Sequence, residues 1–279
     1  MKLFFDSGAT KCDCILLDAD EHYVRHCSDE GINATYMRDE EMTAVLARLH
    51  AQSGSDGIRE VTFSGAGCGN PDNARRLREI LSRLYPAAET EVISDLLGAC
   101  RLLCHNQTGI VAILGTGASA CLYDGNRITR QAPSLGYLLG DEGSGTYLGK
   151  LFIQRFLRDE LPSPVRNDFL NTFGLEKAEI IRRIYREPAP NRFLASFARY
   201  LGDNRDIPYL HDLLTEAFND FFQFQIRPLQ LYNIYILHLM GSVGYHFQDI
   251  IGKVVGKKGF RLGNIAASPL DFLQREEIL

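Results

Sequence analysis

Short apolar stretches alternate with amphipathic stretches along this chain, and their order predicts a fold of strands and helices. Residues 2–5, 12–18 and 22–27 are apolar or alternating and are joined by tight polar turns, which predicts a three-stranded antiparallel meander. Apolar side chains then recur at helical spacing over residues 38–52. The first half is completed by a strand over 60–64, a helix opened by Asn70 and Pro71, a strand over 90–94 and a helix over 96–104.

The second half repeats this scheme. Residues 109–114, 119–123 and 127–131 predict another meander, and a long helical region follows from Thr146 to about Phe224. The chain then predicts a strand over 233–239, a helix over 242–255, a strand over 260–265 and a short C-terminal helix. We therefore expect two lobes of β-β-β-α-β-α type, residues 1–105 and 106–279, with a helical insertion in the second.

Composition narrows the class of protein. The chain has 279 residues, of which 45% are hydrophobic and 23% charged, and its formal net charge is −5. This mildly acidic balance argues against nucleic acid or an anionic membrane as a partner, because both need clustered Lys and Arg. The start of the chain does not resemble a signal peptide, and the apolar run over 234–243 is too short to span a bilayer.

The seven cysteines are an odd number and are scattered along the chain. This pattern predicts buried thiols in a reducing cytoplasm, and none of the cysteines or histidines has the spacing of zinc ligands.

Two turns carry the same glycine–alanine–hydroxyl pattern. The first is Asp6-Ser7-Gly8-Ala9-Thr10-Lys11, and the second is Gly115-Thr116-Gly117-Ala118-Ser119. Glycines allow a tight bend with bare N–H groups and the hydroxyls add donors, so two such turns could clamp a polyphosphate between the lobes. A strand rather than a helix follows each turn, so neither is a Walker loop.

Four acidic residues, at three places along the chain, are candidates for chemistry, and each place has a structural alternative. Asp6, at the end of a buried strand, suits Mg²⁺, but it could also cap a hairpin turn. Asp95 follows a strand and starts a helix, which suits a helix N-cap, a general base at the mouth of a cleft, or both. Asp141 and Glu142 lie in a glycine-rich stretch, which suits either a ligand-binding loop or the first turn of a helix.

Further segments are less specific. Asn33 is locally a polar loop residue, and Gly241-Ser242-Val243-Gly244 is a strand-to-helix turn that would allow close approach of a flat base or a phosphate. The aromatic stretch that contains Phe218, Phe221, Phe222 and Phe224 lacks interleaved Lys and Arg, so we expect it to be helix core or a contact between the subunits of a homodimer.

The paired turns, Gly140-Asp141-Glu142-Gly143-Ser144-Gly145 and Gly241-Ser242-Val243-Gly244 together resemble the sugar kinase, heat-shock 70 and actin superfamily of ATPases. Within it the chain resembles the N-acetylglucosamine kinases and the related BadF/BadG-type ATPases over essentially its whole length. The resemblance implies an α/β fold of two ribonuclease H-like lobes (the actin-like ATPase fold) with a nucleotide cleft between them.

The resemblance also implies a cytoplasmic ATP-dependent kinase that converts N-acetylglucosamine to its 6-phosphate, with ATP and Mg²⁺ bound and Asp95 as the catalytic base. It assigns nucleotide phosphate and metal to Asp6, Gly8, Ala9, Thr10 and Lys11, a second phosphate loop to Thr116 and Gly117, and adenosine to Gly241, Ser242 and Gly244. It assigns the sugar to Asn33, Asp95, Thr116, Gly117, Ser119, Asp141 and Glu142.

The chain departs from the family in two places on the sugar side. It contains no Trp, although relatives commonly have one shortly after the position of Asn33, and it has Ser119 where sugar-binding relatives often carry Asn. The exact sugar therefore stays open. Two other functions also stay open: a BadF-type activator that couples ATP hydrolysis to electron transfer, for which Cys68 is the candidate cluster ligand, and a module that binds nucleotide or sugar without catalysis.

Overall fold

The fold was analysed in a computed structural model, which describes residues 1–8, 10–20, 22–54, 56–230 and 234–276. Contacts divide the chain into two compact units, Met1–Leu102 with Ser268–Leu279, and Leu103–Ala267. The division predicted from the sequence, at residues 105 and 106, differs mainly in its placement of the C-terminal segment, which belongs to the first unit by its contacts.

The first unit is built on a five-stranded mixed sheet with the strand order β3-β2-β1-β4-β5. Its first three strands are the predicted antiparallel meander, and β4 and β5 extend the sheet in parallel to β1. The strands are β1 (Lys2–Ser7), β2 (Lys11–Leu17), β3 (Tyr23–Glu30), β4 (Glu60–Gly65) and β5 (Glu89–Ser94). The parallel pairs place the ends of β1, β4 and β5 at one edge, which is where acidic candidates of this unit lie.

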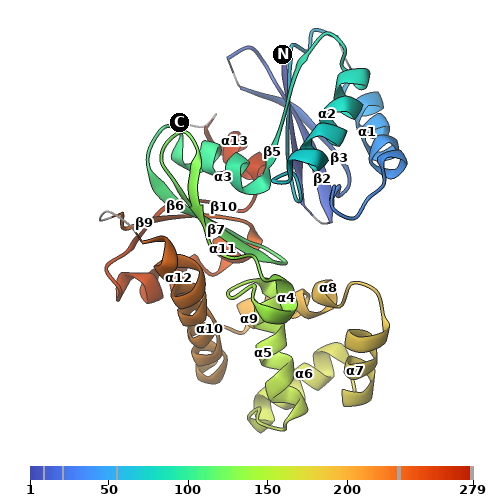
Figure 1. Cartoon of the computed structure of the whole chain (residues 1–279). Coiled ribbons are helices and arrows are strands. Elements are labelled where there is room, and N and C mark those ends of the chain that lie inside the picture. Colours follow the sequence, from blue (N-terminus) through green and yellow to red (C-terminus); the bar gives the residue numbers. More distant parts are fainter. Residues whose placement is uncertain (9, 21, 55, 231–233, 277–279) are drawn as a thin grey trace. The chain divides into compact units, whose positions relative to one another are not determined.

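Helices α1 (Asp39–Ser53) and α2 (Pro71–Leu84) lie side by side against this sheet (Figure 1). The side chain of Asn70 accepts backbone N–H bonds from Asp72 and Asn73, and Pro71 occupies the first turn, so α2 begins where its sequence predicts. The unit is completed by α3 (Asp95–Cys104), which leads into the second unit, and by α13 (Pro269–Glu276).

The second unit contains another five-stranded mixed sheet, with the order β10-β9-β6-β7-β8. Read from its other edge this order matches the first sheet, with an antiparallel meander followed by two parallel strands. The strands are β6 (Gly109–Leu114), β7 (Ala118–Tyr123), β8 (Ile128–Gln131), β9 (Ile236–Met240) and β10 (Arg261–Ala266). The duplicated scheme predicted from the sequence is therefore confirmed at the level of topology.

The predicted helical insertion separates β8 from β9 (Figure 1). It comprises α4 (Gly136–Leu139), α5 (Gly145–Leu157), α6 (Ser163–Phe173), α7 (Lys177–Arg186), α8 (Pro190–Ala195), α9 (Phe197–Asp203), α10 (Pro208–Phe221), a π-helical turn η1 (Phe222–Ile226) and a 3₁₀ turn (Arg227–Leu229). Its core is rich in aromatic rings, and Phe218, Phe221 and Phe222 are buried in it as predicted. Phe224 is 53% exposed, so it is not part of that core.

Two predicted elements have different boundaries. The strand expected over 233–239 begins at Ile236, since Ile234 and Tyr235 are not in a strand and residue 233 lies outside the described residues. The helix expected over 242–255 is two helices, α11 (Ser242–His246) and α12 (Gln248–Gly256). Phe247 interrupts them with non-helical backbone angles, and its buried ring packs on Phe218 at 5.7 Å.

The four-residue helix α4 was not predicted, because one helical turn is too short to show periodicity. Across the described parts of the chain, every helix falls short of the length and apolarity that crossing a membrane requires.

Candidate active site

Candidate residues lie in both units. In the first unit the turn between β1 and β2 is closed by a hydrogen bond from the Gly8 N–H to the Lys11 carbonyl, 3.0 Å long. Thr10 and Lys11 are exposed on this turn, as phosphate binding would require, and Ala9 lies outside the described residues. The Lys11 ammonium lies 2.8 Å from a carboxylate oxygen of Asp13, so this cation has an anionic partner beside the turn.

Three carboxylates of the first unit interact electrostatically. Asp6 and Asp13 are directly paired across β1 and β2, and Asp95 starts α3 at the end of β5. Burial, together with the negative charges of Asp13 and Asp95, raises the pKa of Asp6 to about 7, although Lys11 opposes the shift. Burial also raises the pKa of Asp95, against the hydrogen bond that its side chain accepts from the Leu96 N–H at 2.8 Å.

The capping alternative for Asp95 is wrong. The Ser94 hydroxyl accepts the Leu97 N–H at 3.1 Å, three residues along the chain, which is the bond of an N-cap residue. Asp95 is the first residue of α3 and accepts from the residue directly after it. Its carboxylate is therefore not needed to cap the helix.

These carboxylates fit the Mg²⁺ that the resemblance implies. A partly buried carboxylate that interacts with two others is unfavourable as an anion, which is why the pKa of Asp6 is raised, and a divalent cation would offset that cost. Mg²⁺ prefers oxygen ligands and usually keeps several waters, so one or two carboxylates are enough to hold it.

The loop that carries Asn33 is fixed by long-range bonds. The fully buried Ser7 hydroxyl donates to the Ile32 carbonyl at 3.0 Å and accepts the Ile32 N–H at 2.7 Å. From α2, Arg76 donates to the carbonyls of Ala34 and Met37. The Oδ1 atom of Asn33 accepts the Thr35 N–H at 3.0 Å, so this amide is held in one orientation.

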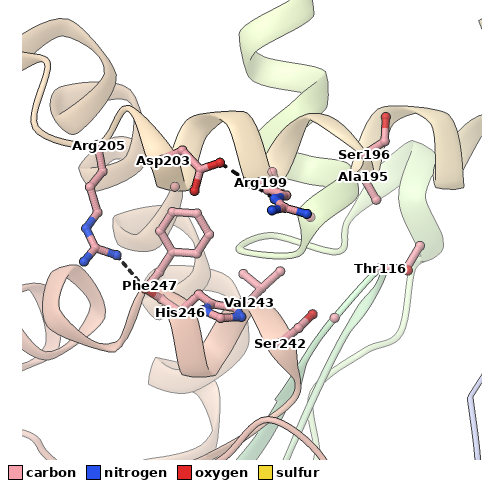
Figure 2. Close-up of a pocket in the computed structure, with 14 residues that line it drawn as sticks. Thr116, Ala195, Ser196, Arg199, Asp203, Arg205, Ser242, Val243, His246 and Phe247 are labelled. Atoms are coloured by element: carbon pink, nitrogen blue, oxygen red, sulfur yellow. Dashed lines mark hydrogen bonds and ion pairs between the residues drawn. The ribbon is translucent and has the colours of Figure 1, made fainter.

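In the second unit a cavity of about 540 Å³ opens beside the second turn (Figure 2). Thr116 of this turn and Ser242 at the start of α11 both line it, so two of the predicted nucleotide-binding segments meet at one cavity. Val243 and Phe247 give it apolar walls. Its charged side chains are those of Arg199, Asp203 and Arg205. The remaining lining residues are His246, Gly115, Gly145, Ala195, Ser196, Ala198 and Gly202.

The charged side chains beside the cavity form an ion pair with each other and a hydrogen bond to the backbone. Arg199 and Asp203 form an ion pair at 3.8 Å on α9, and Arg205 donates to the His246 carbonyl at 3.0 Å (Figure 2). Apolar walls with a few charged groups at the edge suit a flat heterocycle that carries a polar sugar.

Gly241 has a structural reason of its own. Its φ of +105° lies in the region that favours glycine, and a Cβ atom there would lie 2.5 Å from the Leu114 carbonyl oxygen. This close approach packs the turn after β9 against the end of β6. At Gly244 a Cβ atom would lie 3.2 Å from the Leu239 Cβ. Both glycines therefore shape the turn, and their proposed contact with adenosine stays a prediction.

Asp141 and Glu142 lie in a loop, as one of the two sequence interpretations expected, and Ser144 caps the helix that follows. The Asp141 carboxylate lies next to Gly117, where a Cβ atom would be 3.2 Å from its Oδ2. Burial raises the pKa of Asp141, against a hydrogen bond from the Ala118 backbone. The predicted sugar-binding acid thus lies directly against the second turn, and the Ser119 hydroxyl on β7 is 3.4 Å from the Gln131 amide.

Unlike Asp141, Glu142 does not face the second turn but points into the core of the second unit. Its Oε2 accepts a hydrogen bond of 2.8 Å from the Gln225 amide on η1, and both side chains are buried. The next residue, Gly143, has a φ of +80°, and a Cβ atom there would lie 2.7 Å from the Phe221 Cβ. The loop that carries Asp141 is therefore seated on α10 and η1.

Solved structures similar to this chain identify its family. A protein named "Putative N-acetylglucosamine Kinase" from Porphyromonas gingivalis is 37% identical, with a TM-score of 0.92, over 99% of this chain and 98% of the other. The chain belongs to the N-acetylglucosamine kinase-like family. No family model matches the sequence, and a search of curated proteins finds no match.

Less similar solved structures share the fold. A protein of the same name from Chromobacterium violaceum is 20% identical, with a TM-score of 0.71, over 98% of this chain and 96% of the other. A ROK family glucokinase from Streptomyces griseus, in complex with glucose and AMPPNP, is 13% identical, with a TM-score of 0.59, over 98% and 96%. The two mixed five-stranded sheets thus form the actin-like ATPase fold of ribonuclease H-like halves.

The candidate ligand for an iron–sulfur cluster is a buried thiol. Cys68 is 4% exposed, and burial, with the negative charge of Asp95, raises its pKa to about 12. A cluster shared between two subunits would need cysteines at the surface, so the burial of Cys68 does not favour that role, which stays a prediction.

Several residues that hold the site in place were not predicted from the sequence. Ser7 and Arg76 fix the loop of Asn33, and Gln225 holds Glu142. Gln225 lies between Phe224 and Ile226 in an apolar stretch, and a glutamine among apolar residues is a signal that could have marked it. Ser7 and Arg76 have partners far away in sequence, and nothing near them marks that role.

Proposed function

We propose that this chain is an ATP-dependent sugar kinase that phosphorylates the primary hydroxyl of an amino sugar, converting N-acetylglucosamine to N-acetylglucosamine 6-phosphate. The observation that carries the proposal is the electrostatic proximity of Asp6 and Asp95 at the ends of two strands of one sheet. Phosphoryl transfer needs a cation at the phosphates and a proton acceptor at the attacking hydroxyl, and two neighbouring carboxylates can meet both needs.

In this proposal Asp95 orients the sugar hydroxyl and accepts its proton. The new bond joins that oxygen to the γ-phosphorus as the bond between the γ-phosphorus and the departing ADP oxygen breaks. The raised pKa of Asp95 brings its basicity toward neutral pH, which favours proton transfer. Asp6 would hold Mg²⁺, in part through water, and the positive charge offsets that of the phosphate oxygens.

The remaining roles follow from the positions of the candidates. Gly8, Thr10, Lys11, Thr116 and Gly117 would donate to the phosphates of one ATP, and Lys11 would exchange its contact with Asp13 for phosphate. Adenosine would occupy the cavity beside Ser242. Asn33, Ser119, Asp141 and Glu142 would recognise the sugar, with Glu142 already bonded through one oxygen to Gln225.

A coupled assay of ADP release tests the reaction itself. We expect release that depends on the sugar when N-acetylglucosamine, glucosamine, glucose and N-acetylmannosamine are compared, with the highest kcat/KM for the first. ADP release that no sugar stimulates would contradict a sugar kinase. Nucleotide binding without any release would identify a non-catalytic module.

The role of Asp95 is tested by Asp95→Asn. Because the amide cannot accept the hydroxyl proton, we expect kcat to fall about 100- to 10,000-fold while ATP affinity stays within a few-fold of the wild type. Asp72→Asn is a matched control, since Asp72 also lies in the first turn of a helix but is exposed. Equal turnover of the Asp95→Asn variant would refute the assignment of the base.

A further inference from the structure

Two cysteines face each other across neighbouring strands of the first sheet. Cys14 on β2 is directly opposite Cys27 on β3 in the antiparallel register. Directly opposed residues have Cα atoms about 4.5 or 5.5 Å apart and side chains on the same face. Disulfides span Cα separations of about 4.4–6.8 Å, so this register allows a disulfide without moving either strand.

The two thiols are not equivalent. The Cys14 thiol donates a hydrogen bond to the Cys27 sulfur, which is the main reason that the pKa of Cys27 falls to about 7. Arg25, on the same face of β3, also favours the Cys27 thiolate, while burial and Asp13 oppose it. From α1 the Leu49 carbonyl lies 4.0 Å from the Cys27 sulfur, and Ser53 interacts with Cys14. The pKa of Cys14 is raised by the same thiol–thiol bond and by burial.

A small cavity gives access to this pair. Its volume is about 210 Å³, and its lining includes both cysteines, Arg25 and Ser53. Cys27 is partly exposed, whereas the other six cysteines of the chain are buried. A small oxidant can therefore reach Cys27 more readily than any other thiol, and an accessible thiolate is the form that reacts.

We infer that Cys27 and Cys14 form a site of reversible thiol oxidation, at which a hydroperoxide oxidises Cys27 and Cys14 then closes a cross-strand disulfide. The Cys27 thiolate attacks a hydroperoxide oxygen, and the O–O bond breaks to leave a sulfenic acid and, after protonation, water or an alcohol. The Cys14 sulfur then attacks the Cys27 sulfur. The S–S bond forms, the S–O bond breaks, and hydroxide leaves with the Cys14 proton as water. Two thiols lose two electrons and one hydroperoxide gains them.

The test treats the full chain with hydrogen peroxide, alkylates the remaining thiols and digests the protein with trypsin. We expect the peptides of residues 12–25 and 26–38 to be joined, and two of the seven thiols to be lost. Fragmentation of the joined peptides distinguishes Cys14 from Cys12, so the result does not depend on a variant that folds. A reductant should release both peptides with free thiols.

Variants add a second line of evidence. Cys14→Ala and Cys27→Ser should each abolish the joined peptides, whereas Cys121→Ser, which removes a buried thiol of the second unit, should leave them unchanged. In the untreated protein, alkylation of Cys27 should accelerate as pH rises through about 7. A link through Cys12 or another cysteine would overturn the inference. Oxidation of Cys27 to its sulfinic acid without a link, or no oxidation of Cys27, would do the same.

Discussion

Single residues of this chain carry charges in places where the fold makes them costly. Asp6 is the clearest case, because burial and two neighbouring carboxylates raise its pKa from 3.8 to about 7. The folded protein therefore binds this proton more tightly than the unfolded chain does. Protonated Asp6 therefore contributes to the free energy of unfolding. This contribution is complete below pH 4 and is lost as the pH rises through about 7.

The substitution Asp6→Asn removes this titration, so we expect it to change the free energy of unfolding in a pH-dependent way. In the absence of divalent cations the variant should unfold at a similar urea concentration to the wild type near pH 4. It should be more stable at pH 8, by an amount on the order of 4 kcal/mol at most. Urea unfolding with a chelator present measures this, with the exposed Asp72→Asn as a control for net charge. Equal stability of Asp6→Asn and wild type at pH 8 would mean that Asp6 carries no buried charge.

Gln225 shows how one buried amide can hold a loop. Gln225→Leu would leave the buried Glu142 carboxylate without its donor, which costs about 1–3 kcal/mol. If the sugar-kinase proposal holds, the same change should raise KM for the sugar more than KM for ATP, because Asp141 is carried by the same loop. Gln223→Leu, two residues away and exposed, should change the free energy of unfolding by less than about 0.5 kcal/mol. Denaturant unfolding and steady-state kinetics of the two variants test this prediction. Equal effects of Gln225→Leu and Gln223→Leu would mean that Gln225 does not hold the loop.

At the scale of elements, turns between strands and helices decide where the candidate side chains lie. The turn after β9 is the tightest of these, since Gly241 combines a positive φ with a contact to the Leu114 carbonyl that leaves no room for a Cβ atom. This turn also places Ser242 at the cavity, beside Thr116.

Gly241→Ala should therefore destabilise the protein by at least about 2 kcal/mol, since the backbone must leave its angles or push β6 away. Gly256→Ala is the matched control, because Gly256 ends α12 in open space without a positive φ. That change should be neutral or stabilise by up to about 1 kcal/mol. Thermal unfolding compares the two, and similar melting temperatures would contradict the packing argument.

Helices and strands whose apolar residues recur at a regular spacing were predictable from the sequence, and irregular elements were not. The meanders were recognisable because their strands alternate or are continuously apolar between turns, and α2 because Asn70 and Pro71 mark its start. The break at Phe247 was missed because the apolar positions keep their helical spacing across it while the ring turns into the core. Acidic candidates were marked by their place at strand ends, whereas Ser7 and Arg76 act through partners that only the folded chain brings near.

At the scale of the whole molecule, the chain returns to its first unit at the end. The segment from Ser268 onward, including α13, belongs by its contacts to the unit formed by residues 1–102. The first unit is thus not a continuous piece of sequence, whereas the second, Leu103–Ala267, is, although the strand order of the two sheets is the same.

Removal of residues 268–279 should accordingly weaken the first unit. We expect faster amide hydrogen exchange in β1 to β5 of the shortened chain, while β6 to β10 keep the protection they have in the full chain. Exchange measured by mass spectrometry on both proteins reports each strand separately. Faster exchange restricted to the second unit would contradict the assignment of α13.

The repeated strand order makes the two halves comparable position by position. Asp6 precedes Gly8 by two residues, and Gly115 precedes Gly117 by two, so the acid of one copy corresponds to a residue without a side chain in the other. The first copy therefore carries a carboxylate at a position where the second offers only backbone. Because Gly115 lines the cavity of the second unit, Gly115→Asp would bring a negative charge to that cavity and should weaken the binding of an anionic ligand there.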